Sequence, residues 1–149
     1  TEDSPICYKM SNQEVSHIRL SPAVTNRILF VYIGNKQNSK REIKRFSQLQ
    51  VSDHSIQQMN QVIENVLVAN EIVEFERCMN ESEQILASIL EVRPLKELLF
   101  PDYPFMVKSM GAWGGDFFMA TYRDEAVARK YFSDLGYTTQ FTYSEIIKN

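Results

Sequence analysis

The chain has 149 residues, of which 44% are hydrophobic and 23% charged, and its formal net charge is −3 from 16 Lys and Arg against 19 Asp and Glu. This composition is typical of a globular domain with one core. No apolar run approaches the roughly 20 residues that span a bilayer, and no signal-peptide pattern opens the chain. We therefore expect a cytoplasmic protein without a membrane partner. The mild acidity argues against nucleic acid as a partner.

Cysteine and histidine give no sign of a metal or redox site. Cys7 and Cys78 lie far apart and form no Cys-x-x-Cys pair, which disfavours a disulfide or a zinc site. His17 and His54 are equally isolated from each other and from both cysteines. We predict reduced thiols and no metal bound by this chain.

The first elements in chain order are a linker and a strand. Residues 1–14 are polar and irregular apart from Ile6-Cys7-Tyr8, and predict a linker or the remnant of a preceding domain, which leaves residues 15–149 as one domain. The apolar, β-branched and aromatic run over residues 28–33 predicts a buried central strand that ends at Gly34. The chain does not begin with Met, so we expect a processed product or a fragment of a longer protein.

Three helical segments are expected next. Ser39 and Glu42 form a capping-box pattern and predict a short helix that buries Ile43 and Phe46. A second helix follows Ser52 or Asp53, and a third, one long helix or two, ends before Pro94. Their apolar stripes have helical spacing and predict core positions: Ile56, Met59, Ile63, Val66, Ile72, Phe75, Met79, Leu86 and Leu90.

The C-terminal third predicts a short helical turn over residues 95–100, followed by a strand, a helix and a second strand. Residues 116–122 predict a strand, and Asp124 and Glu125 open a helix that ends at Gly136. The buried face of that helix is expected to hold Val127, Ala128, Tyr131, Phe132 and Leu135. Residues 138–142 predict an edge strand. The order of elements predicts an α+β sandwich, with helices over one face of a small sheet.

Three of the five glycines fall within five residues, in Gly111-Ala112-Trp113-Gly114-Gly115. Such a loop between extended segments suits either backbone N–H groups brought close to an anion or a tight hairpin. The spacing alone does not decide between these readings. The pattern is neither the Walker motif nor the dinucleotide fingerprint.

The run of residues 108–118 resembles the third, C-terminal motif of the GHMP small-molecule kinases, which include galactokinase, homoserine kinase and mevalonate kinase. The stretch Gly111-Ala112-Trp113-Gly114-Gly115-Asp116-Phe117 resembles the bacterial GYDIA-type branch more narrowly. A second likeness is the Asn35-Lys36-Gln37-Asn38-Ser39 loop after the first strand. The resemblance runs from about residue 5 to the end of the chain.

The resemblance implies a GHMP kinase C-terminal domain over residues 15–149, a ferredoxin-like sandwich with a small, mainly antiparallel sheet and helices on one face. It implies that Lys108, Gly111, Ala112, Gly114 and Gly115 support the nucleotide-phosphate loop. Candidates for the substrate cleft are Trp113, Asp116, Lys36, Gln37 and Ser39. The sequence departs from the family pattern at Met110, Trp113 and Asp116, and it identifies no catalytic residue.

The family's N-terminal half carries the phosphate-binding loop, and no glycine- and serine-rich loop precedes residue 108. We therefore expect the substrate-side half of an ATP-dependent kinase, whose acceptor is a small-molecule alcohol or phosphate. ATP and Mg²⁺ would bind the intact protein together with the missing N-terminal kinase domain, and the chain alone is expected to be inactive. The sequence does not decide whether the protein forms a homodimer. The alternative is a free-standing α+β ligand-binding or assembly module without catalysis.

Overall fold

The computed structural model describes residues 5–34, 47, 49–111 and 115–147. Its main sheet has four antiparallel strands in the order β4-β5-β3-β6. These are β3 (Ile28–Tyr32), β4 (Val107–Ser109), β5 (Phe117–Thr121) and β6 (Gln140–Thr142). From β3 to β6 the elements run strand, helices, two strands, helix and strand, which is the ferredoxin-like order. The predicted α+β fold with a small antiparallel sheet is confirmed.

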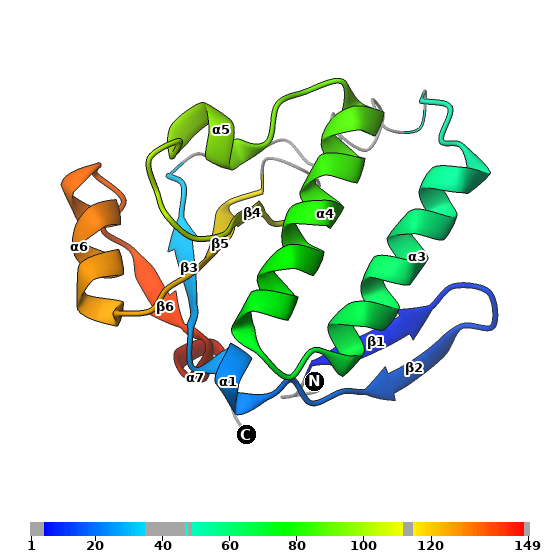
Figure 1. The fold of residues 1–149 in the computed structure, drawn as a ribbon, viewed down its shortest axis with the longest axis horizontal. Coiled ribbons are helices and arrows are strands. Elements are labelled where there is room, and N and C mark those ends of the chain that lie inside the picture. The colour runs from blue at the N-terminus through cyan, green and yellow to red at the C-terminus, as the bar shows by residue number, and fades with distance from the viewer. Residues whose placement is uncertain (1–4, 35–46, 48, 112–114, 148–149) are drawn as a thin grey trace.

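Helices cover both faces of this sheet, not one (Figure 1). Ile28 and Phe30 of β3 pack toward Phe75 of helix α4, whereas Leu29 and Val31 pack toward helix α6. The prediction of one covered face is corrected because β3 is apolar on both sides. The helices are α1 (Pro22–Thr25), α3 (Asp53–Val68), α4 (Ile72–Leu90), α5 (Leu95–Leu99), α6 (Glu125–Asp134) and α7 (Tyr143–Ile146).

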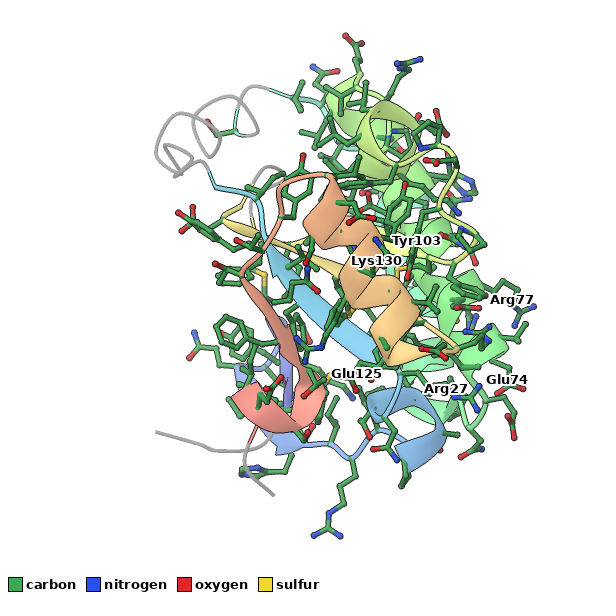
Figure 2. All side chains as sticks on the ribbon, turned by 90° about the vertical axis from the view of Figure 1, so that its left-hand side faces the viewer. Arg27, Glu74, Arg77, Tyr103, Glu125 and Lys130 are labelled. Atoms are coloured by element: carbon green, nitrogen blue, oxygen red, sulfur yellow. The ribbon has the colours of Figure 1, made fainter. Side chains whose placement is uncertain are left out.

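The core on the α6 side is rich in aromatic rings. Phe100 stacks at 4.8 Å from Phe118 of β5 and at 5.3 Å from Phe132 of α6, measured between ring centroids. Tyr103 lies against α6 (Figure 2) and donates its hydroxyl proton to the Thr121 carbonyl oxygen at 2.7 Å. Burial of such rings contributes much of the hydrophobic stabilisation of a small domain.

The helix ends follow the predicted capping. The Ser52 hydroxyl accepts from the Ser55 N–H at the start of α3, and the Asp124 carboxylate accepts from the Val127 N–H at the start of α6. Helix α4 is one continuous helix, which settles the alternative of one or two. Gly136 has φ +94° after α6, as its predicted terminating role requires. The helix predicted from Ser39 lies outside the described residues.

Residues Ile6–Lys9, which include the apolar Ile6-Cys7-Tyr8, form strand β1, which pairs antiparallel with β2 (Glu14–His17). Two details of the predicted helix faces are wrong. Val127 and Leu135 of α6 are exposed because that helix buries only a narrow stripe. Ile56 and Ile63 of α3 are also exposed, at 48% and 43%. None of the described helices is long and apolar enough to cross a membrane.

Candidate functional site

The glycine loop is the connection of the β4–β5 hairpin. The Met110 N–H donates to the Phe117 carbonyl at 3.3 Å, and the Gly115 N–H donates to the Met110 carbonyl at 3.2 Å. Gly111 has φ +69°, and a Cβ at Gly115 would overlap the Met110 carbonyl oxygen. Both positions therefore need glycine for the backbone path itself. The predicted site residues Ala112, Trp113 and Gly114 lie outside the described residues.

This loop ends beside the end of strand β3. The Ile33 N–H donates to the Asp116 carbonyl oxygen at 2.8 Å, and the rings of Tyr32 and Phe117 are 5.3 Å apart. The chain turns at Gly34, with φ +87°, and enters the segment that holds Lys36, Gln37 and Ser39. Those three predicted residues lie outside the described part of the chain. This bond places the end of β3, which precedes the segment with Lys36, Gln37 and Ser39, next to Asp116, a predicted residue of the substrate cleft.

Asp116 is a polar residue at this edge of the sheet. Its backbone carbonyl is held by Ile33, and its side chain is half-buried. Among the described residues, its carboxylate has neither a hydrogen bond nor an ion pair. A carboxylate in this position can accept a hydrogen bond from a ligand hydroxyl.

Lys108 does not stand free at the entry of the loop. Its Nζ lies 3.1 Å from Oε1 of Glu83 on α4, and the Ser109 hydroxyl lies 3.5 Å from the other carboxylate oxygen. Glu83 is 2% exposed. Burial raises the pKa of Glu83, and the charge and hydrogen bond of Lys108 oppose that rise. The described geometry gives Lys108 the role of fastening β4 to α4; support of a phosphate loop stays a prediction.

Glu83 was absent from the predicted site, although the sequence carries a signal for it. Counting in helical steps from Phe75 and Met79 places Glu83 on the apolar stripe of α4. A charged residue on such a stripe needs a buried partner. Its partner Lys108 comes from a strand 25 positions later in the chain.

A second charged cluster joins α4 to the end of β5. Both carboxylate oxygens of Glu76 accept from Arg123, at 2.9 and 2.8 Å, and one also accepts from the Thr121 hydroxyl. The Arg123 guanidinium lies 4.6 Å from the centre of the Phe105 ring. Burial acts to raise the pKa of Glu76, but the hydrogen bonds from Arg123 and Thr121 outweigh it and lower that pKa. The cluster is a structural fastening, since its groups satisfy one another.

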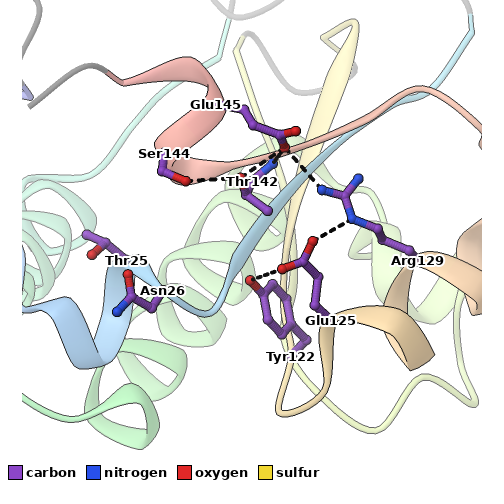
Figure 3. A pocket seen from close by; sticks show the side chains of 8 residues that line it. All are labelled: Thr25, Asn26, Tyr122, Glu125, Arg129, Thr142, Ser144 and Glu145. Atoms are coloured by element: carbon purple, nitrogen blue, oxygen red, sulfur yellow. Dashed lines mark hydrogen bonds and ion pairs between the residues drawn. The ribbon is translucent and has the colours of Figure 1, made fainter.

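A polar cavity of about 390 Å³ lies at the opposite edge of the sheet from the glycine loop (Figure 3). Arg129 is held on three sides: it donates to Glu125 at 2.7 Å, to Glu145 at 3.1 Å and to the Gln140 carbonyl at 3.2 Å. Its guanidinium is thus already committed to these acceptors, which leaves it poorly placed to bind a phosphate. The other lining residues are Thr25, Asn26, Tyr122, Thr142 and Ser144.

Comparison with known proteins supports the fold. No protein-family model matches the sequence, and no curated protein matches it significantly. The structure is similar to the crystal structure of a Lin0012 protein from Listeria innocua, with a TM-score of 0.64 and 15% sequence identity. The match covers 83% of this chain and 39% of that one, so the chain spans well under half of the length of this similar protein. The likeness shows a shared α+β fold.

Proposed function

We propose that this chain is the C-terminal, substrate-side domain of an ATP-dependent small-molecule kinase of the GHMP type. The ferredoxin-like order of strands supports the proposal, as does the glycine loop between β4 and β5. The observation that carries it is the hydrogen bond from the Ile33 N–H to the Asp116 carbonyl. Ile33 lies just before residues 35–39, and Asp116 belongs to residues 111–117. The bond therefore shows that the two stretches that resemble the kinases adjoin the same edge of the sheet.

In the proposed reaction, an oxygen of the acceptor bonds to the γ-phosphorus of ATP while the bond from that phosphorus to the β–γ bridging oxygen breaks. The products are the phosphorylated acceptor, ADP and the proton of the acceptor hydroxyl. Such transfer depends mainly on positioning and electrostatic stabilisation. This chain would supply one wall of the cleft, where the Asp116 carboxylate orients the acceptor hydroxyl.

No group of three or more His, Cys, Asp or Glu side chains among the described residues is placed to hold a metal ion. In the proposed kinase, the preceding domain that the resemblance implies would hold Mg²⁺ and the ATP phosphates. The residues of this chain position the acceptor.

A second candidate function is a ligand-binding or assembly module without catalysis. The backbone at Gly111 and Gly115 favours it, because both glycines are required by the hairpin whether or not a ligand binds. Turnover of ATP by the full-length product separates the two functions.

The test is ADP release by the natural full-length product that contains this chain, with small alcohols and phosphate monoesters as acceptors. We expect turnover, and we expect Asp116→Asn to lower kcat/KM at least about tenfold, which corresponds to about 1.4 kcal/mol of transition-state stabilisation. Asp134→Asn, which changes an exposed carboxylate paired with Lys130, is the matched control and should leave kcat/KM unchanged. Absence of turnover with every acceptor overturns the proposal, and steady ADP release by this chain alone overturns the division into two halves.

A further inference from the structure

An apolar cavity of about 260 Å³ lies between the β1–β2 hairpin, α3 and α4. Figure 1 shows α3 running beside α4, with the hairpin next to the lower end of α3. Ser82 and Lys108 are the polar residues of its lining. The remaining lining side chains are Ile6, Cys7, Ile18, Met59, Val62, Ile63, Val66, Leu67, Met79 and Leu86.

The protein covers this apolar surface incompletely. Val62 is the one fully buried residue of α3, and Ile63 stays 43% exposed. On the hairpin, Ile6 is 47% exposed. An amphipathic helix normally buries its apolar stripe, and a contiguous exposed apolar patch marks a binding surface.

The polar end of the cavity selects the head group of a ligand. Lys108 lines the cavity and is paired with Glu83, and their side chains are 18% and 3% exposed. The pair has no net charge. An anionic head group would lie near the buried carboxylate, and a cationic one would lie near the ammonium group. A hydroxyl group suits both, because it can accept from Lys108 and donate to a carboxylate.

The size of the cavity limits the ligand to a short hydrocarbon. Its volume is about 260 Å³. That is larger than a cavity of roughly 150 Å³ that takes benzene, and smaller than the pockets of roughly 300–1,000 Å³ that hold drug-sized ligands.

We propose that this cavity binds the hydrocarbon chain of a medium-chain aliphatic alcohol, with the alcohol hydroxyl directed toward Lys108. The proposal concerns binding alone, because the acceptor hydroxyl of the proposed reaction lies at Asp116 and not at Lys108. Lys108 and Ser109 lead directly into the glycine loop, so the hydroxyl end of the ligand would lie on the side of the proposed cleft. The binding itself requires no ATP.

Isothermal titration of this chain with 1-butanol, 1-hexanol, 1-octanol and 1-decanol tests the binding. Affinity should rise about fourfold for each added methylene, as expected from about 0.8 kcal/mol per buried CH₂. It should stop rising at the length that fills the cavity. Octanoate and octylamine should bind at least about tenfold more weakly than 1-octanol, a difference of about 1.4 kcal/mol. No saturable binding of hexanol or octanol, or equal binding of the charged analogues, overturns the proposal.

A cavity-filling variant locates the ligand. Val66→Trp should weaken 1-octanol binding at least about tenfold. Val127→Trp, at a 66% exposed position on α6, is the matched control and should bind as the unchanged chain does. If Val66→Trp fails to fold, Met59→Phe fills the same cavity with a smaller change of volume. Unchanged octanol affinity in the folded variant overturns the proposal, and so does a dimer in ultracentrifugation that excludes octanol.

The two proposals fail in distinguishable ways. An alcohol that binds this chain, in a full-length protein that transfers no phosphoryl group from ATP to any acceptor, refutes the proposed function and leaves the cavity assignment standing. Phosphorylation of other acceptors by a protein whose cavity takes no alcohol refutes the cavity assignment alone.

Discussion

Replacing Lys108 with Met tests the fastening of strand β4 to helix α4. The substitution removes the ammonium group 3.1 Å from the Glu83 carboxylate and leaves that carboxylate, 3% exposed, without its counter-charge. Removing one partner of a buried ion pair costs about 3–5 kcal/mol. We take about 3 kcal/mol, because Lys108 itself is 18% exposed. In a domain of this size each kcal/mol lowers Tm by about 2–4 °C, so we expect a fall of about 6–12 °C at neutral pH.

The pH dependence of this loss has a definite sign. Burial raises the folded-state pKa of Glu83 above the ordinary glutamate value of 4.5. A raised pKa means that the folded state binds the proton more tightly, so the associated stability is complete below pH 4.5 and is lost as pH rises through the folded pKa. Lys108→Met removes the group that opposes this rise. Its Tm deficit should therefore be small near pH 4.5 and should grow toward neutral pH.

Thermal unfolding of four proteins at several pH values measures the effect: the unchanged chain, Lys108→Met, Glu83→Gln and the double variant. Glu83→Gln should cost about 1 kcal/mol, because the exposed end of Lys108 can reach water. The double variant should be more stable than Lys108→Met at neutral pH, since it holds no uncompensated buried charge. A Lys108→Met variant within about 1 kcal/mol of the unchanged chain, with no pH dependence, would refute the reasoning.

Three further outcomes follow from contacts elsewhere in the fold. Gly115→Ala should cost about 2–3 kcal/mol in thermal unfolding, because its Cβ would overlap the Met110 carbonyl oxygen and strain the loop; an unchanged Tm would show that the loop can shift freely. Tyr103→Phe should cost about 1 kcal/mol in urea unfolding, since it removes a buried hydrogen bond; equal stability would contradict that bond. Arg123→Gln should cost about 1 kcal/mol near pH 7. Because the pKa of Glu76 is lowered below 4.5, this cost should shrink as pH falls through that pKa, and a pH-independent cost would exclude the pair.

The sequence predicts those elements whose own residues carry a strong signal. Helix α3 begins at the predicted Ser52 cap, and α6 lies between the predicted Asp124 and Gly136. Strand β3 follows from its apolar, β-branched run. The same run contains the evidence for two covered faces, because it has no polar alternation. That pattern is typical of a strand buried on both sides.

The remaining features depend on contacts between distant segments. Strand β1 has four residues that are mostly exposed, so it shows no periodic pattern. The pair of Lys108 and Glu83 joins a strand to a helix across 25 positions. The position of the glycine loop was predictable from its flanking extended segments, but its junction with Ile33 depends on strand pairing. The sequence therefore predicts which residues are candidates for the site better than it predicts the residues that contact them in the fold.

The most direct test of the central claim is phosphorus NMR of the natural full-length product that contains this chain, incubated with ATP, Mg²⁺ and small alcohols or phosphate monoesters. We predict a new resonance that grows together with those of ADP, from a phosphate ester when the acceptor is an alcohol or from a diphosphate ester when it is a phosphate monoester, and much slower growth with Asp116→Asn. Resonances of ATP alone, or of ADP and inorganic phosphate without a new ester, would contradict the assignment of this chain to the substrate side of a kinase.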